Sequence, residues 1–277
     1  MRWTPGGRSP NLEDRRSGGG MGRGLGIGGT VVVLALSLIF GRNLFTDLGV
    51  QPAVGAASAP FTAADSAAQE QEVQFVSFVL DDVQNTWTKV FNQYGRGSRY
   101  HPARLVLFRN STDSGCGAAQ SVMGPFYCPV DEKVYLDLGF FDELKQKFGA
   151  SGDFAQAYVL AHELGHHVQR LLGTDARVRQ LQEANPSEAN QLSVRLELQA
   201  DCYAGVWGHS TEQRQLLQQG DIEEALTAAS AVGDDRIQKR TTGRINVDSF
   251  THGSAAQRTE WFKRGFQSGD PASCNTL

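Results

Sequence analysis

Two histidines one helical turn apart, His162 and His166, enclose Glu163 within the sequence HELGH. Four residues advance an α-helix by about 400°, so the two imidazoles lie on one face and can bind the same metal ion. Glu163 lies about 100° further round, where its carboxylate can take a proton from a metal-activated water. Two nitrogen ligands beside a base predict a zinc site that performs hydrolysis.

A hydrolytic zinc site needs a third protein ligand and one open coordination position. The extended motif with a third histidine does not apply, because that position is Leu172. Glu197 and Asp201 stand four residues apart in the apolar run LELQADCYAGVW, where a charged group requires a partner. Two solvated carboxylates are the alternative. We expect Glu197 to be the third ligand and Asp201 to accept the free N–H of a ligating histidine.

Helix and strand patterns place these residues in a mainly helical domain. Asp153 and Gln156 form a capping-box pattern that opens the helix of HELGH, and Pro186 opens the helix that carries Glu197. Short apolar runs rich in β-formers predict two strands, over 104–108 and 133–138. Periodic apolar residues predict a further helix over 73–94. The expected fold class is therefore α+β, with a small β-sheet.

The sequence HELGHH, followed by ELQADCYAGVW, resembles the bacterial neutral zinc metallopeptidase family, the YpfJ-like group of the Glu-ligated zincins. The resemblance covers nearly the whole chain, through MRW, LEDRR, SVMGPFYCP, VYLDLGFFDEL, SVRLELQADC, SFTHGSAAQR and GDPASCNT. It implies a membrane-anchored, zincin-like domain with one Zn²⁺ ion and a peptide or protein substrate. It also implies that the strand at 134–138 is the outer strand along which zincins align a peptide.

The expected reaction is hydrolysis of a peptide bond with Glu163 as the general base. His252, in the loop SFTHGS, is the candidate donor to the developing oxyanion, and an ordinary loop histidine is the alternative. The main alternative function is a catalytically inactive, metal-stabilised binding or scaffold protein of the cell envelope. An iron oxygenase and an interaction module in which the motif is accidental are further alternatives.

The first 70 residues differ in composition from the rest. Residues 1–23 are rich in Gly and Arg, which predicts a disordered cytoplasmic leader. The uncharged run from Gly24 to Gly41 predicts a transmembrane anchor over 24–45, since it would rise about 27 Å as a helix. A cleaved signal peptide is the alternative. Residues 46–70 have linker composition, and 71–277 form the predicted metallopeptidase domain.

Charge and cysteine usage indicate where this domain lies. Arginines before the apolar run outnumber those after it, which predicts a single-pass inner or plasma membrane protein with a cytoplasmic amino terminus and a periplasmic or extracytoplasmic domain. Two disulfides would suit that side: Cys116 with Cys128, and Cys202 with Cys274. Four free buried thiols are the alternative. A net charge of −4 disfavours nucleic-acid binding.

Overall fold

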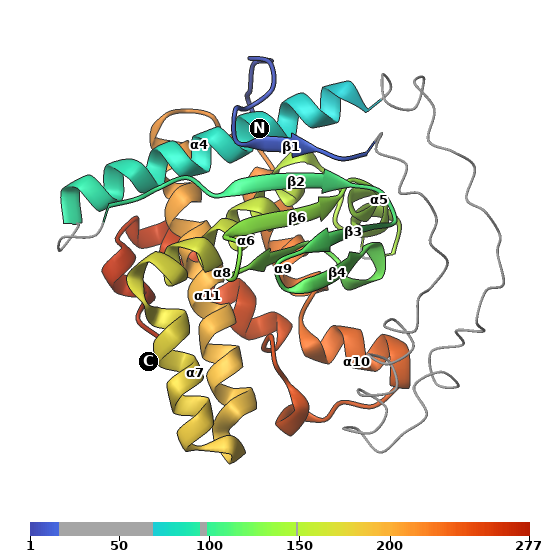
Figure 1. Ribbon diagram of the computed structural model, residues 1–277, viewed down its shortest axis with the longest axis vertical. Helices are drawn as coiled ribbons and strands as arrows, with labels where there is room; N and C mark the ends of the chain where they lie inside the picture. The colour runs from blue at the N-terminus through green and yellow to red at the C-terminus, as the bar shows by residue number, and fades with distance from the viewer. Residues whose placement is uncertain (17–68, 95–98, 148) are drawn as a thin grey trace, which may run out of the picture. The chain divides into compact units, whose positions relative to one another are not determined.

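The computed structural model describes residues 1–16, 69–94, 99–147 and 149–277 (Figure 1). Residues 1–15 and 69–277 form one compact unit. The second unit, 16–68, consists almost entirely of residues outside the described ranges. Helices predominate in the first unit and surround a small sheet, so the predicted α+β class is confirmed.

The main sheet has the strand order β1 (Leu12–Asp14), β2 (Arg104–Phe108), β6 (Lys133–Asp137) and β5 (Phe126–Cys128). β1, β2 and β6 run parallel, and β5 is antiparallel to β6. Alternate residues of β2 are buried on opposite faces: Leu105 and Leu107 lie in the main core, Val106 and Phe108 in a smaller cluster. The hairpin of β3 (Ser111–Ser114) and β4 (Gly117–Gln120) adds Ala119 to that cluster.

The main core lies between the sheet and two long helices, α4 (Glu70–Tyr94) and α6 (Asp153–Leu172). The apolar residues of α4 from Val73 to Trp87 are buried, apart from the partly buried Phe78, as their helical spacing predicts. The other helices are α5 (Gly139–Gln146), α7 (Thr174–Ala184), α8 (Ala189–Gln213), α9 (Asp221–Ala231), α10 (Asp234–Thr242) and α11 (Ala255–Ser268). α8 and α11 lie side by side (Figure 1).

Helices α8 and α11 approach each other closely because each presents a glycine at the contact. A Cβ atom on Gly205 would collide with the backbone of Phe262, and one on Gly265 would collide with the carbonyl of Cys202. Any larger residue at either position would push the two helices apart. The glycines therefore set the distance between α11 and the helix that carries Glu197.

Two disulfides pair the cysteines as predicted, Cys116 with Cys128 and Cys202 with Cys274. The first joins the turn between β3 and β4 to the end of β5. The second joins α8 to the last turn of the chain, and both of its cysteines are fully buried. The carboxyl-terminal segment is thus covalently fixed to α8.

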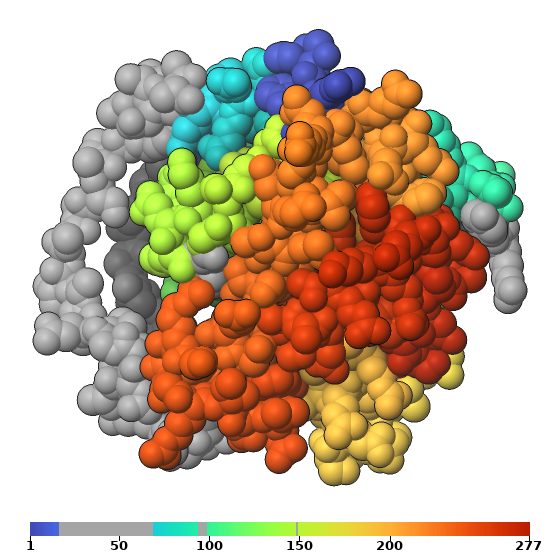
Figure 2. All heavy atoms as spheres, turned by 180° about the vertical axis from the view of Figure 1, so that it is seen from behind, coloured from blue at the N-terminus to red at the C-terminus, as the bar shows by residue number. Residues whose placement is uncertain are grey.

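Residues 1–16, the described part of the predicted leader over 1–23, are ordered and so differ from the prediction of a disordered segment. Residues 12–14 form β1, with Leu12 opposite Leu105 of β2. The N-cap position of α6 is Gly152, so Asp153 is not the predicted capping-box residue. Its carboxylate, like that of Asp221, contacts the α-ammonium group of Met1. Figure 2 shows the leader, in blue, packed between α4 in cyan and the orange segment of α9. A Gly- and Arg-rich segment cannot fold alone, but here the domain supplies its partners.

The predicted anchor over 24–45 and nearly all of the predicted linker over 46–70 lie outside the described residues. α4 begins at Glu70, next to the expected start of the domain. Within the described ranges, no helix combines the length and the apolar character needed to cross a membrane.

The strand over 133–138 is present as β6, but it is not an outer strand. β6 is hydrogen-bonded to β2 on one side and to β5 on the other. The outer strands of this sheet are β1 and β5, and the one beside β6 is β5, a three-residue segment between Pro125 and Pro129 that has no clear strand pattern of its own. The expectation that residues 134–138 form an outer strand is therefore wrong, because β5 covers that edge of β6.

Candidate metal centre

Helix α6 carries His162 and His166 at its centre, on the face turned toward α8. Gly173 ends the helix in the left-handed conformation, with φ of 75°. The centroids of the two imidazole rings lie 4.9 Å apart, with the ring planes at 86° to each other. The four-residue spacing thus places both rings at one point, as predicted.

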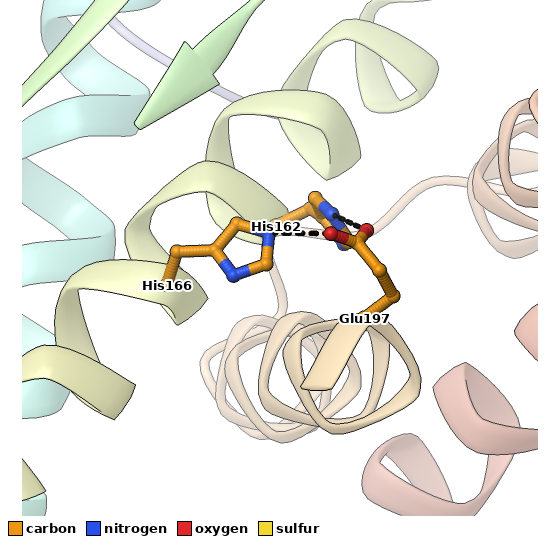
Figure 3. A group of neighbouring side chains, drawn as sticks. All are labelled: His162, His166 and Glu197. Carbon is orange, nitrogen blue, oxygen red and sulfur yellow. Dashed lines mark hydrogen bonds and ion pairs between the residues drawn. The ribbon is translucent and has the colours of Figure 1, made fainter. Parts of the chain in front are cut away.

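Glu197 of α8 directs its carboxylate at both rings (Figure 3). Its Oε2 atom lies 3.2 Å from Nε2 of His162, and its Oε1 atom lies 3.4 Å from Nε2 of His166. One possible ligand atom from each residue lies within 4.8 Å of the other two. The structure therefore brings together all three residues that the sequence suggests as ligands.

Gly165, within HELGH, allows α6 and α8 to come close enough for this contact. A Cβ atom at Gly165 would lie 3.1 Å from the carbonyl oxygen of Ala200. That distance is shorter than an ordinary contact, so a side chain here would move α8 and with it Glu197 and Asp201.

Each histidine is held through its other nitrogen. Nδ1 of His162 lies 2.8 Å from Oδ1 of Asp201, which is the acceptor role expected for that carboxylate. Nδ1 of His166 lies 2.8 Å from Oε1 of Gln169, whose amide nitrogen donates to the carbonyl of Leu196. An N–H at Nδ1 leaves the lone pair of each ring on Nε2, the nitrogen that faces Glu197.

The sequence analysis did not identify Gln169 or Arg258 as parts of this site. Gln169 is three residues after His166, and that spacing alone marks it as a neighbour on the helix. Arg258 comes from α11 and is 3 % exposed; its Nε and Nη2 atoms lie 2.8 and 3.0 Å from the two carboxylate oxygens of Asp201. Nothing in the chain order links α11 to Asp201, so only the tertiary structure locates this ion pair.

The charges around the histidines follow from these contacts. Burial alone would lower the pKa of His162, but Asp201 and Glu197 outweigh it and raise the pKa to about 10. Burial would raise the pKa of Glu197, but the two histidines hold it well below its ordinary value. The pKa of Asp201 is likewise lowered, against the effect of burial, by Arg258 and His162. Two ionised carboxylates thus lie beside the imidazoles and stabilise positive charge there, whether it is carried by a proton or by a metal ion.

His162, His166 and Glu197 line a cavity of about 560 Å³, which Glu163 and His252 also line. The side chain of Glu163 forms no hydrogen bond or ion pair to any other described residue, so its carboxylate is available to accept a proton. His252 has Nδ1 3.2 Å from Oδ1 of Asp234. The other carboxylate oxygen of Asp234 accepts the backbone N–H groups of Thr251, His252 and Gly253. Asp234 therefore shapes the loop that brings His252 to the cavity.

The donor set fits zinc. Two imidazole nitrogens and one carboxylate oxygen are a ligand set of catalytic zinc sites, in which the fourth position stays open for water or substrate. Here both Nε2 atoms converge on Glu197, both Nδ1 atoms are already hydrogen-bonded, and a cavity adjoins the group. The carboxylates of Asp153, Asp221 and Glu224 also lie close together, but the α-ammonium group of Met1 contacts the first two.

Comparison with known proteins agrees with this chemistry. The family model described as "Putative neutral zinc metallopeptidase" matches residues 1–277. Uncharacterized protein YpfJ of Escherichia coli (strain K12) is 49% identical over 285 residues, which cover 100% of this chain and 99% of that protein. Uncharacterized protein Mb2605 of Mycobacterium bovis is 50% identical over 189 residues, 64% of this chain and 63% of that protein. No solved structure shows a significant match to the chain. The chain belongs to the neutral zinc metallopeptidase family.

Proposed function

We propose that this protein is a zinc-dependent peptidase that hydrolyses peptide bonds with Glu163 as the general base. One observation carries the proposal: the Nε2 atoms of His162 and His166 and the carboxylate of Glu197 converge at the wall of a cavity that Glu163 also lines. A purely structural metal site has no need of an open cavity or of a free carboxylate beside it.

His162, His166 and Glu197 would hold a single Zn²⁺ ion. When bound, zinc supplies a Lewis acid that polarises the scissile carbonyl and lowers the pKa of water to about 7. Asp201 and Gln169 keep both imidazoles in the tautomer that presents Nε2, because each accepts the hydrogen bond of an Nδ1–H.

Glu163 moves the proton during the reaction. Its free carboxylate accepts a proton from the attacking water as the water oxygen bonds to the carbonyl carbon. It then delivers this proton to the amide nitrogen as the C–N bond breaks. Glu163 is 8 % exposed, so a peptide that fills the cavity would shield it from bulk water and strengthen its interaction with the reacting groups.

His252 is placed to stabilise the negative charge on the carbonyl oxygen. Asp234 holds its Nδ1 atom, which leaves Nε2 as the nitrogen that can donate to a substrate. The Asp234 carboxylate also supports the protonated ring, because its hydrogen bond raises the pKa of His252. A donor held in place before the reaction is the arrangement that stabilises an oxyanion.

The outer strand β5 gives the cavity a surface for an extended peptide. Phe126 and Tyr127 of β5 line the cavity, and β6 occupies only one edge of the strand. Val122 and Met123, in the turn before β5, line the cavity too and are 88 % and 59 % exposed. A peptide added along β5 would use backbone hydrogen bonds for affinity and these apolar side chains for selection.

A Glu163→Gln variant tests the proposal. We expect the rate of hydrolysis of a mixed peptide library to fall by ~10²–10⁴-fold, because the variant loses its general base. Its zinc content should equal that of the wild type, because Glu163 is not a ligand. Glu183→Gln, the same change on the exposed face of α7, should leave both unchanged. Unchanged hydrolysis by the Glu163→Gln variant would contradict the mechanism. A zinc-loaded wild type without hydrolysis would favour the inactive scaffold.

A further inference from the structure

The leader is hydrogen-bonded into the sheet of the domain. β1 lies in parallel register beside β2, with Asp14 opposite Leu107. The backbone N–H of Leu105 donates to the carbonyl of Asn11 at 2.9 Å, and the N–H of Arg15 donates to the carbonyl of Leu107 at 2.8 Å. Two strands paired in this way must lie in the same compartment, because no membrane can separate them.

Side chains of the leader pack on the domain as well. The ring of Trp3 meets Phe75 of α4 edge-on, with centroids 5.3 Å apart. The hydroxyl of Ser9, itself buried, donates to Asp81 of α4 at 2.6 Å. Met1 is only 4 % exposed and belongs to the main hydrophobic core. These contacts bury apolar and polar groups together, so residues 1–15 of the leader are an integral part of the fold.

Two arginines of the leader, Arg8 and Arg15, have partners within the domain. Nε of Arg8 donates to Glu70 of α4 at 3.1 Å. Nη1 of Arg15 donates to the hydroxyl of Thr112 at 3.1 Å and to the carbonyl of Asp113 at 3.0 Å. The sequence-based prediction of topology assigns positively charged residues before an apolar run to the cytoplasmic side of the membrane. Arg8 and Arg15 are held by groups of the domain, which offers a physical reason for their presence that is independent of membrane topology.

The disulfides indicate which compartment the leader and the domain share. Cys116–Cys128 and Cys202–Cys274 both lie in the unit that contains β1. Disulfides persist in oxidising compartments outside the cytoplasm.

We propose that residues 1–15 and 69–277 both lie outside the cytoplasm, so that the chain between them crosses a membrane an even number of times or not at all. A single crossing would separate β1 from β2. The proposal therefore replaces the expected cytoplasmic amino terminus, and it does not depend on peptidase activity.

Labelling of the full-length chain with a membrane-impermeant maleimide, in spheroplasts of Escherichia coli, tests this topology. Gly6→Cys places a thiol on an exposed part of the leader, where an added Cβ meets no atom within 4 Å. Ser187→Cys places one on the exposed turn before α8. We expect both thiols to react equally without detergent. A Gly6→Cys thiol that reacts only after permeabilisation, beside a reactive Ser187→Cys thiol, would overturn the proposal. Protection of both would overturn the extracytoplasmic placement.

A cross-link measures the strand pairing itself. Glu13 and Val106 are register partners in β1 and β2, and neighbouring strands lie about 4.8 Å apart, within the Cα separation that a disulfide accepts. In the Glu13→Cys, Val106→Cys variant, thiols are blocked in intact cells and peptides are mapped without reductant. We expect a linked peptide that contains both positions. Glu13→Cys combined with Ser187→Cys is the control and should give none. Absence of the Glu13–Val106 link would contradict the proposal.

Discussion

Oδ1 of Asp201 lies 2.8 Å from Nδ1 of His162, so one fully buried carboxylate determines which imidazole nitrogen faces Glu197. Gln169 does the same for His166 through an amide oxygen instead of a carboxylate. The two histidines of the motif are therefore held by acceptors of different charge. A charged acceptor strengthens the ring as a metal ligand more than a neutral one does.

The role of Gln169 leads to a prediction about zinc affinity. Gln169→Met removes the acceptor of His166 while nearly keeping the side-chain volume, so the ring loses its fixed tautomer. We expect the affinity for zinc to fall by about 10–100-fold. Competition with a chromophoric chelator measures this. Gln182→Met is the matched control, since it also removes an amide that donates to a backbone carbonyl, on α7. Equal affinity in the two variants would show that Gln169 only supports packing.

His252 should affect the chemical step and not metal binding. In His252→Gln, the Nε2 donor to the oxyanion is lost, while His162, His166 and Glu197 are unchanged. We expect kcat to fall by about 10²–10³-fold, the effect of removing one oxyanion donor, with little change in KM. Zinc content measured in the same preparation should equal the wild-type value. A rise in KM at constant kcat would instead indicate a role in substrate binding alone.

The ion pair of His252 and Asp234 predicts a pH dependence of stability. The hydrogen bond of Asp234 raises the pKa of His252 above 6.5, and the histidine and backbone N–H groups, against burial, lower the pKa of Asp234 below 3.8. The contribution of His252 to the free energy of unfolding is fully present below the pKa of the unfolded histidine and is lost as the pH rises through its pKa in the folded protein. The aspartate's contribution is lost as the pH falls through its lowered pKa. The His252–Asp234 pair therefore stabilises the folded protein most between the lowered pKa of Asp234 and the raised pKa of His252.

Thermal unfolding of His252→Asn at two pH values measures this contribution. The loss in Tm relative to the wild type should be larger at about pH 5.5 than at about pH 9, because the contribution of the charged histidine is present below its unfolded pKa and is lost as the pH rises through its raised folded pKa. The His252 side chain is 52 % exposed, so water screens the pair and the difference will be small. A larger loss at the higher pH would contradict the assigned direction.

Residue spacing in the sequence was sufficient to predict the parts of the site that lie on a single helix. The HELGH spacing places His162, Glu163 and His166 without reference to any other element, and the four-residue step relates Glu197 to Asp201 in the same way. Arg258 was not predictable, since its position depends on the close packing of α11 against α8. β1 was not predictable for a related reason: its partners lie 90 or more residues further along the chain, and its own composition is that of an unfolded segment.

The two disulfides should differ in their effect on stability. Cys202 and Cys274 are 72 residues apart and Cys116 and Cys128 are 12 apart. A disulfide that closes a longer loop removes more entropy from the unfolded chain. Removal of Cys202–Cys274 should therefore lower the free energy of unfolding by about 4 kcal/mol, and removal of Cys116–Cys128 by about 3 kcal/mol. Denaturant unfolding of Cys274→Ala and Cys116→Ala measures both. The opposite order would show that native contacts, and not loop entropy, dominate.

Arg258 should act on zinc through Asp201. Its two nitrogens contact both oxygens of that carboxylate, so Oδ1 is held in the direction of His162. Arg258→Met leaves a buried carboxylate without its main cation, which we expect to cost about 3–5 kcal/mol of folding stability. Because Asp201 can then turn away from the ring, the affinity for zinc should also fall by about 10–100-fold. Arg258→Lys should lose less, since an ammonium group can still reach one oxygen.

Two comparisons separate this positioning role from simple destabilisation. Arg264→Met changes the same residue type on the exposed side of α11, where the guanidinium stacks on Trp261, and should leave zinc affinity unchanged. In a double-mutant cycle, Asp201→Asn combined with Arg258→Met should lower zinc affinity by less than the sum of the single losses, because both act through one hydrogen bond to His162. Additive losses, or a destabilised Arg258→Met with wild-type zinc affinity, would mean that Arg258 stabilises the fold without orienting the ligand.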